Sequence, residues 1–285
     1  MENYQNKTDL LISSQDGFSL FYQKWIPTEK VERIIVFQHG LGEHSDRYQN
    51  LIQAFSGTGT AFYAPDARGH GRSGGKRGHV ARFQHFIHDL HDLIQRVRQE
   101  NDNQKVFLLG HSMGGAIVLK YALTKDYQDG LRGLIGSSPG VEPVMDWIKK
   151  IQKPVAAVLS RVAPSLTLDN QLDVNNLSHN EHVVTAYQAD PLVHSKASTL
   201  LGYSLFNVHH DIYRAASSIQ IPVYLMHGTA DRLTNPEATQ KFYELLGSTD
   251  KTLRLYPGLY HETMNERAED RQRVLDELKT WVLAR

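Results

Sequence analysis

A serine between small residues joins a predicted strand to a predicted helix in this chain. It lies in the pentapeptide G-H-S-M-G at 110–114, after an apolar run at 106–109 and before a helix-like stretch at 116–123. A sharp turn at this place lifts the serine hydroxyl above the end of a sheet, and the small neighbours let the backbone adopt a strained conformation. Strand, turn and helix together predict a nucleophile elbow with Ser112 at its tip.

A nucleophile elbow requires a carboxylate and then a histidine later in the chain, each in a loop that follows a strand. Residues 221–228 have the composition of a strand that runs into a turn, and Asp231 lies just beyond it. His261 is the only histidine after Asp231, and it follows a short strand pattern at 252–256. Glu142 also follows a predicted strand and is an alternative acid. We favour Asp231 because its glycine-containing turn better suits a carboxylate held at a strand end.

Each of these residue types has a defined task in acyl transfer. The Ser112 hydroxyl is a poor nucleophile at neutral pH, so His261 must take its proton during attack and return it to the leaving group. Asp231 is expected to hold the imidazole in the correct tautomer and to stabilise its protonated form. The tetrahedral oxyanion needs preorganised donors, which we predict to be the backbone amides of Met113 and Leu41.

Strand and helix patterns alternate along the chain, as a mostly parallel sheet requires. The clearest helix has apolar residues at a 3.6-residue period between Phe83 and Val97. Roughly 80 residues interrupt the alternation after Ser137, too many for a simple crossover. We therefore predict a core formed by 1–140 and 216–285, with a cap insertion at 141–215. The predicted strands are 18–25, 34–37, 61–64, 106–109, 131–137, 223–227 and 252–256.

The predicted cap contains an apolar stripe at helical spacing. Such a stripe commonly packs in a core, but part of it could instead surround an acyl tunnel and contact a membrane surface transiently. Three lysines beside the stripe would favour an anionic lipid surface, and a proline is expected to kink or divide the helix. The stripe consists of Val144, Ile148, Ile151, Val155, Val158, Leu159 and Val162, the lysines are Lys149, Lys150 and Lys153, and the proline is Pro154.

The composition argues against several other classes of protein. The 31 basic and 31 acidic residues balance, so the basic excess typical of nucleic-acid binding is absent. The sequence has no cysteine, which excludes disulfides and a thiol nucleophile. Residues 1–7 lack the apolar core of a signal peptide, and no segment approaches the roughly 18 apolar residues of a spanning helix. These features predict a cytoplasmic protein, peripheral to a membrane if the cap contacts lipid.

No cofactor or metal is predicted. His261 and Glu262 begin an H-E-x-x-H motif, but Asn265 stands where the second histidine is required. The histidines at 85, 88 and 91 are typical of a solvated helix face. No G-x-G-x-x-G sequence follows a strand, so a dinucleotide cofactor is not expected either.

Six blocks of sequence carry a resemblance to a known family. They are H-G-L-G-E-H-S-D-R-Y at 39–48, D-A-R-G-H-G-R-S at 66–73, G-H-S-M-G-G at 110–115, L-S-H-N at 177–180, Y-Q-A-D-P-L at 187–192 and H-G-T-A-D-R at 227–232. The chain resembles the monoacylglycerol lipase and lysophospholipase family of α/β-hydrolases, which is grouped with the serine aminopeptidases. The resemblance implies an α/β-hydrolase fold, with a mostly parallel eight-stranded sheet flanked by helices and a helical cap insertion.

The resemblance also implies where substrate is held. In monoacylglycerol lipases the positions that match Glu43, Arg47 and Tyr187 help to hold the glycerol end, so these three are candidates for headgroup binding. Their ordinary structural alternative is an ion pair and a packed tyrosine. Leu41 departs from the smaller alanine common in the mammalian enzymes, although its backbone can still donate.

The predicted function is a serine hydrolase that cleaves single-chain acyl esters, monoacylglycerols or lysophospholipids, through an acyl-serine intermediate. A short-chain carboxylesterase or an acyltransferase with the same triad is the nearest alternative. An alternative of another class is a non-catalytic protein of this fold that binds a ligand, because one fold hosts many functions.

Overall fold

A computed structural model describes residues 3–144 and 147–285, with side chains described outside 147–154. Its centre is an eight-stranded sheet in the order β1-β2-β4-β3-β5-β6-β9-β10. The pairs β1-β2 and β2-β4 are antiparallel, and every neighbouring pair from β4 to β10 is parallel. The strands are β1 (Tyr4–Ile12), β2 (Ser19–Pro27), β3 (Arg33–Gln38), β4 (Thr60–Pro65), β5 (Val106–His111), β6 (Leu131–Ser137), β9 (Val223–Gly228) and β10 (Lys251–Tyr256). This confirms the predicted α/β-hydrolase fold class.

Strand β1 is the part of the sheet that the residue patterns missed. It forms one edge of the sheet and pairs with β2 alone among the described strands. Most of its side chains are exposed, including Leu10 and Ile12. Because most of β1 is exposed on both faces, its sequence lacks the alternation by which a half-buried strand is recognised.

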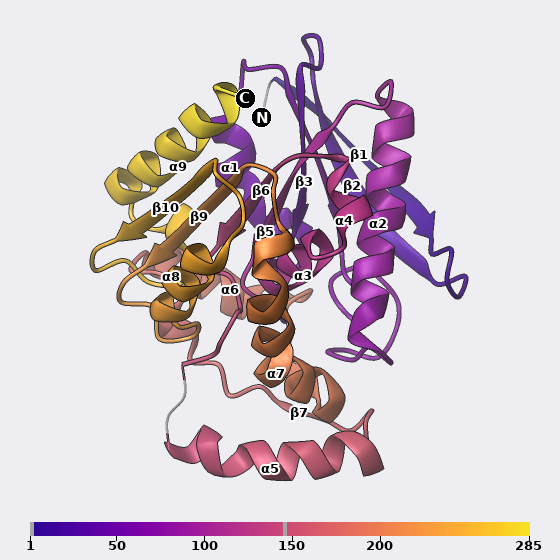
Figure 1. Ribbon diagram of the computed structural model, residues 1–285, viewed down its shortest axis with the longest axis vertical. Helices are drawn as coiled ribbons and strands as arrows, with labels where there is room; N and C mark the ends of the chain where they lie inside the picture. The colour runs from indigo at the N-terminus through magenta and orange to yellow at the C-terminus, as the bar shows by residue number, and fades with distance from the viewer. Residues whose placement is uncertain (1–2, 145–146) are drawn as a thin grey trace.

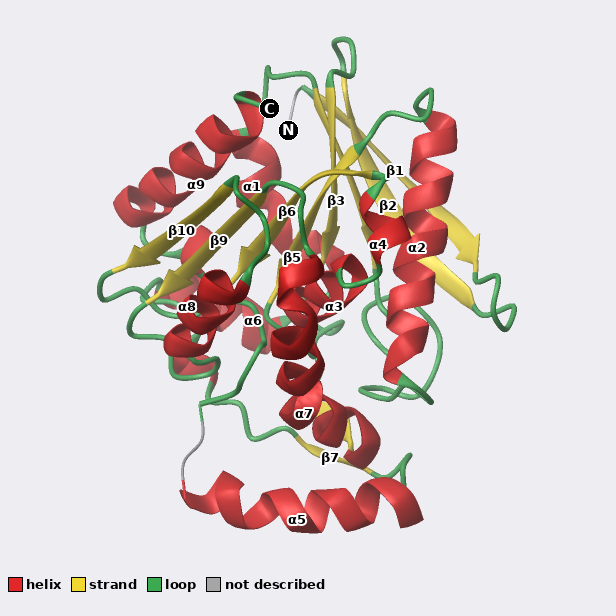
Figure 2. Cartoon of the chain, in the orientation of Figure 1, coloured by secondary structure: helices red, strands yellow, loops and turns green. Residues whose placement is uncertain are grey.

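Helices cover both faces of the sheet (Figure 2). Alternation along β3 explains the two layers, because Ile34 and Val36 pack on one side whereas Ile35 and Phe37 pack on the other. The first side carries α2 (Phe83–Glu100), α3 (Met113–Ala122), α7 (Thr199–Ala215) and α8 (Pro236–Leu245), and the second carries α1 (Gln49–Ala54) and α9 (Ala268–Leu283).

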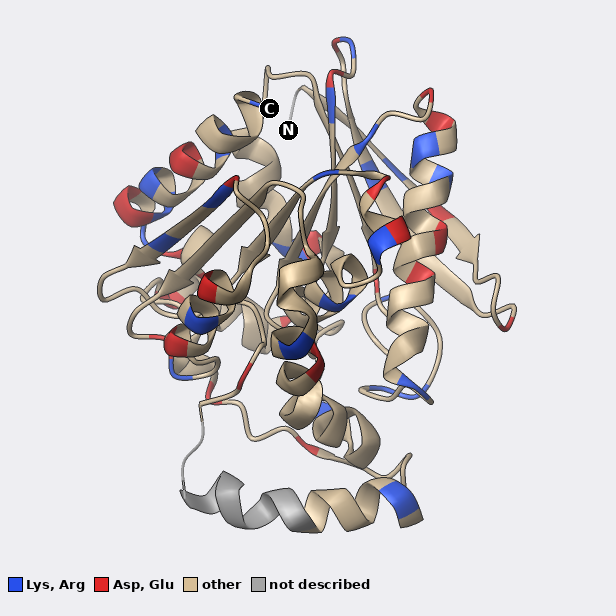
Figure 3. Ribbon diagram, in the orientation of Figure 1, with Lys and Arg blue, Asp and Glu red and all other residues tan. Residues whose placement is uncertain are grey.

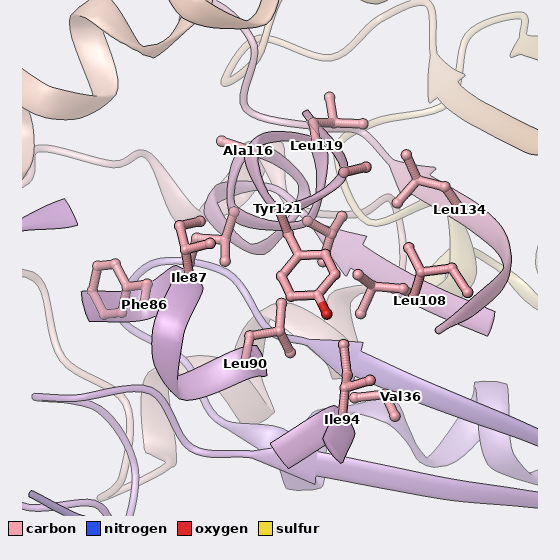
Figure 4. Packing of buried hydrophobic residues seen from close by; sticks show 14 of the residues in the cluster. Val36, Phe86, Ile87, Leu90, Ile94, Leu108, Ala116, Leu119, Tyr121 and Leu134 are labelled. Atoms are coloured by element: carbon pink, nitrogen blue, oxygen red, sulfur yellow. The ribbon is translucent and has the colours of Figure 1, made fainter. Parts of the chain in front are cut away.

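Helix α2 confirms the clearest periodic pattern in the sequence. Its residues Phe86, Ile87, Leu90 and Ile94 are buried, and they pack with residues of α3 and the sheet (Figure 4). Helix α3 begins directly after Ser112, so its close packing against α2 and the sheet helps to fix the position of the serine.

The segment between β6 and β9 adds several helices and a two-stranded sheet, β7-β8, that is not part of the eight-stranded sheet. Figure 1 shows α5 lying beyond the ends of the sheet strands, with α7 leading back to the core. The segment contains α5 (Trp147–Val162), β7 (Thr167–Asp169), η2 (Val174–Asn176), α6 (Glu181–Ala189), β8 (Lys196–Ser198) and α7. It is not wholly helical, because β7 and β8 pair antiparallel. Pro154 does not divide α5, which is one helix.

Short helices complete the chain: η1 (Ser45–Tyr48), α4 (Lys125–Gln128), η3 (Ala216–Ser218) and η4 (Thr263–Asn265). Within the described residues, none of the helices combines the length and apolarity needed to cross a bilayer.

Candidate active site

Ser112 has the backbone conformation of the predicted elbow. It lies between the end of β5 and the first residue of α3, with φ of 54° and ψ of −121°. A positive φ is uncommon for a residue with a Cβ and is strained outside glycine. Two hydrogen bonds hold this conformation: the Ser112 amide donates to Ser137 O at 3.1 Å, and the Gly140 amide donates to Ser112 O at 2.7 Å.

The two glycines that flank the elbow are required by close packing. A Cβ on Gly110 would overlap the carbonyl of Gly114, and a Cβ on Gly114 would overlap the carbonyl of Gln38. Gln38 ends β3, so the small residues bring the start of α3 against the end of the neighbouring strand. The G-x-S-x-G spacing therefore has a steric cause in this chain.

Asp231 and His261 form a buried pair, with Asp231 Oδ2 2.7 Å from His261 Nδ1. The other carboxylate oxygen accepts the amides of Leu233 and Thr234, at 2.7 and 3.1 Å. Burial by itself raises the pKa of Asp231, but the charge of His261 and hydrogen bonds from His227 and His261 lower that pKa below its ordinary value. The carboxylate is thus ionised at neutral pH and oriented to accept a hydrogen bond from Nδ1–H.

The opposite shift occurs on His261. Burial disfavours its protonated form, yet Asp231, and then Glu262 and Glu43, raise the pKa of His261 above its ordinary value. Stabilisation of the protonated imidazole by these carboxylates suits His261 to take a proton and return it.

A second histidine contacts the same carboxylate oxygen, and the sequence patterns did not reveal it. His227 Nε2 lies 2.9 Å from Asp231 Oδ2, and His227 Nδ1 lies 2.8 Å from Thr239 Oγ1. Thr234 Oγ1 donates to Asp231 Oδ2 at 2.9 Å. The available signal was the position of His227 at the end of β9, four residues before Asp231.

The elbow and the histidine loop lie next to each other. The rings of His111 and His261 have centroids 4.7 Å apart. Ser138 Oγ donates to the carbonyl of His261 at 2.7 Å. Ser138 lies two residues before Gly140, whose amide donates to Ser112 O. Burial and the neighbouring His261 lower the pKa of His111 to about 4, so its ring is neutral at pH 7.

Glu142, the alternative acid, is directed elsewhere. Burial is the largest cause of the raised pKa of Tyr213, and the Glu142 side chain raises that pKa further through a hydrogen bond and its charge. The backbone carbonyl of Glu142 accepts the amide of Asn235 at 2.9 Å. The structure therefore pairs Asp231, and not Glu142, with His261.

The two predicted oxyanion donors belong to segments that meet at Ser112. Within the described part of the chain, neither the Leu41 amide nor the Met113 amide makes a hydrogen bond. Met113 directly follows the serine, and a Cβ built on Gly40 would lie 3.1 Å from Ser112 Cβ. Free amides beside a nucleophile are the arrangement by which serine hydrolases stabilise an oxyanion.

Two of the three headgroup candidates are engaged in a buried ion-pair network. Glu43 Oε2 lies 2.6 Å from Arg47 Nη1. The Arg47 guanidinium also makes two hydrogen bonds to Glu262, at 2.7 and 2.9 Å. Tyr187 lies over the guanidinium, 4.6 Å from its centre. Glu262 was missed as a partner because the sequence shows it merely as the second residue of an incomplete H-E-x-x-H motif.

Comparison with known proteins shows one family throughout. The family profile described as serine aminopeptidase, S33, matches residues 29–268. A monoacylglycerol lipase from Mycolicibacterium smegmatis is 34% identical, covering 94% of this chain and 94% of the relative. Human monoglyceride lipase is also 34% identical, covering 99% of this chain and 92% of the relative.

A solved structure agrees with the sequence comparisons. The crystal structure of a monoacylglycerol lipase from Paleococcus ferrophilus is similar with a TM-score of 0.81 and 36% identity. The match covers 93% of this chain and 98% of that chain. Fold and sequence thus point to the same relatives over nearly the whole length.

Proposed function

This chain belongs to the serine aminopeptidase S33 family of α/β-hydrolases and is a serine hydrolase of acyl esters, and on that premise we propose that it cleaves monoacylglycerols or lysophospholipids. The catalytic residues in this proposal are Ser112, His261 and Asp231. The observation that carries it is the buried 2.7 Å pair of Asp231 and His261 beside a strained serine elbow.

In the proposed reaction, His261 Nε2 removes the Ser112 proton as Oγ attacks the ester carbonyl. The amides of Leu41 and Met113 stabilise the oxyanion of the tetrahedral intermediate. Protonated His261 then gives its proton to the departing alcohol, and the acyl-serine forms as the C–O bond breaks. Water, deprotonated by His261, attacks the acyl-serine, and His261 then returns the proton to Ser112 Oγ as its bond to the acyl carbon breaks and the fatty acid leaves. Asp231 stays ionised throughout and holds the imidazole.

The substrate class rests on the relatives and on the insertion between β6 and β9. We divide the chain into a core at 1–140 and 216–285 and a cap at 141–215. Tyr187, on cap helix α6, is nearly buried, and a Cβ on Gly42 would lie 3.5 Å from its hydroxyl. This places Tyr187 beside the oxyanion loop, where it is the best of the three headgroup candidates.

The cap also supports a transient contact with a lipid surface. Val155, Val158 and Val162 of α5 are exposed, as are Leu166 and Leu168 after it. Residues 155–162 of α5, whose side chains are described, include one charged residue, Arg161. The rest of this stretch is uncharged (Figure 3). An exposed apolar helix face of this kind favours the boundary of a membrane or micelle. Ile148, Ile151 and the three lysines of the stripe lie outside the described side chains. A cytoplasmic location stays a prediction from the sequence.

Substrate profiling with an active-site control tests the proposal. Wild-type enzyme should react with a fluorophosphonate probe and hydrolyse 1-decanoylglycerol and lysophosphatidylcholine. Ser112→Ala should lose labelling and at least about a thousandfold in turnover. Exclusive cleavage of short simple esters would favour a carboxylesterase, and transfer to an added alcohol in place of water would favour an acyltransferase. Absence of both labelling and turnover would favour a ligand-binding protein.

The lipid contact has its own test. Val158→Asp should impair hydrolysis of vesicle-bound long-chain substrate several-fold more than hydrolysis of a soluble short ester, because it adds charge to the exposed face. Thr167→Asp adds the same charge at a partly buried cap position and serves as a control. Equal losses on both substrates would contradict the lipid contact.

A further inference from the structure

A continuous chain of contacts connects Ser112 to the histidine loop through charged side chains. Gly40 packs against Ser112, and the Gly40 amide donates to Glu43 Oε1 at 2.6 Å. The other oxygen of Glu43 pairs with Arg47 at 2.6 Å. Arg47 in turn holds both oxygens of Glu262, which directly follows His261. The segment with the predicted oxyanion donor is therefore tied to the segment with the predicted base.

The three charged side chains are enclosed. Their exposed fractions are 5% for Glu43, 10% for Arg47 and 4% for Glu262. Tyr48 donates to Glu43 Oε1 at 2.9 Å, and the ring of Tyr187 covers one face of the guanidinium. Each carboxylate oxygen of the network thus has a protein partner.

A small cavity adjoins the two carboxylates of the network. The adjoining cavity has a volume of about 10 Å³ and is lined by Glu43, Tyr48, His111, Glu262, Met264 and Asn265. A cavity of this size accommodates one water molecule. The ion pairs of Arg47 with Glu43 and Glu262 are buried, so breaking either pair would be costly.

We propose that the Glu43–Arg47–Glu262 bridge is a positioning device for the hydrolytic reaction, which holds the oxyanion loop at a fixed distance from His261. This inference rests on the proposed ester hydrolase function. Arg47 suits the task because its planar fork makes two parallel bonds to one carboxylate while a third bond reaches the other.

The bridge also carries an electrostatic consequence. Two carboxylates and one guanidinium leave one net negative charge. Burial lowers the pKa of Arg47, but the pairing with Glu262 and Glu43 raises that pKa by more and holds the guanidinium protonated. Glu262 and Glu43 both raise the pKa of His261. Removing the charge of Glu262 should therefore make His261 easier to deprotonate, in addition to loosening its position.

The decisive variant is Glu262→Gln, which keeps the side-chain shape and removes the charge. Its matched control is Glu269→Gln, which removes the same charge at an exposed position of α9. Both are assayed with 1-decanoylglycerol and with p-nitrophenyl decanoate, which has the same acyl chain and no glycerol. We expect Glu262→Gln to lower kcat about tenfold on both esters, with KM changed less than twofold. The acid limb of kcat/KM should move to lower pH.

The alternative results are distinct. A rise in KM confined to the glycerol ester would show headgroup binding and overturn the proposal, as would wild-type kcat or an unmoved acid limb. If Glu262→Gln fails to fold, judged by thermal unfolding, Glu43→Gln is measured in its place with the same expectations. Failure of the function itself is separate, because then the wild-type protein would hydrolyse neither ester and Ser112 would not label.

Discussion

The amide of Glu262 donates a 2.7 Å hydrogen bond to the carbonyl oxygen of Leu177, which joins the histidine loop to the segment between β6 and β9. The His261 amide makes a longer bond to the neighbouring Asn176 carbonyl, at 3.4 Å. Leu177 is itself buried. The position of the proposed base therefore depends on the segment between β6 and β9 as well as on the loop that carries His261.

Glu266 strengthens this connection, and its loss should weaken both stability and turnover. The nearly inaccessible carboxylate accepts the Tyr260 amide at 2.8 Å and the His179 amide and ring at 3.0 and 2.9 Å. Glu266→Ala leaves these donors without an acceptor, so we expect a loss of about 2 kcal/mol in the free energy of unfolding. Urea denaturation measures this change, and Glu269→Ala on the surface should stay within about 0.5 kcal/mol of wild type.

Replacing Ser112 by glycine should abolish turnover and yet raise stability. The positive φ of Ser112 costs of order 1 kcal/mol for a residue with a Cβ, and glycine adopts that conformation without the cost. Against this, glycine gains entropy in the unfolded chain. We expect Ser112→Gly to unfold at a higher temperature than Ser112→Ala, which retains the strain. Calorimetry on the two inactive variants makes the comparison, and a lower Tm for the glycine variant would contradict strain at the elbow.

His227 should act through Asp231. Its Nε2–H shares the carboxylate oxygen that His261 uses, so its removal frees the carboxylate to rotate. We expect His227→Leu to lower kcat about tenfold with little change in KM. His227→Gln should recover most of the loss, because its amide nitrogen can donate from a similar position. Equal activity of the Leu and Gln variants would show that the hydrogen bond is unimportant.

The raised pKa of His261 sets the direction of the pH dependence. The neutral imidazole is the base, so kcat/KM should fall as pH drops through the pKa of His261 in the free enzyme, with a midpoint above the ordinary value of about 6.5. Asp231→Asn removes the main favourable charge and should move this limb to lower pH, while lowering kcat at least about a hundredfold. A limb at or below pH 6.5 in the wild type would contradict the raised pKa.

The same shift gives a sign for stability. A pKa that is higher in the folded state means that protonated His261 stabilises the fold. This contribution is fully present below the unfolded pKa of about 6.5 and is lost as pH rises through the folded pKa. Chemical denaturation at several pH values should show the decrease in wild type, and Asp231→Asn should reduce it.

Local patterns in the sequence were sufficient for the elbow, the layers of the sheet and the order of the reacting residues. The glycines around Ser112 are required by close packing within a single turn. The spacing of apolar residues in α2 indicates which face of that helix is buried. Such signals extend over a few residues, so they can be read without knowing what lies across the molecule. The strand β1 escaped this reasoning because its exposed side chains carry no period.

Only the tertiary structure decided which charged groups meet. Arg47 and Glu262 are 215 positions apart. Their pairing depends on how the segments that follow β3 and β10 meet beyond the carboxyl ends of these strands. The same holds for the contact of Glu262 with Leu177 and for the carboxylates that raise the pKa of His261 against the effect of burial. Sequence alone named the proposed catalytic residues, whereas long-range packing determined the charges and hydrogen bonds around them, because electrostatic energies depend on distance and burial and not on order along the chain.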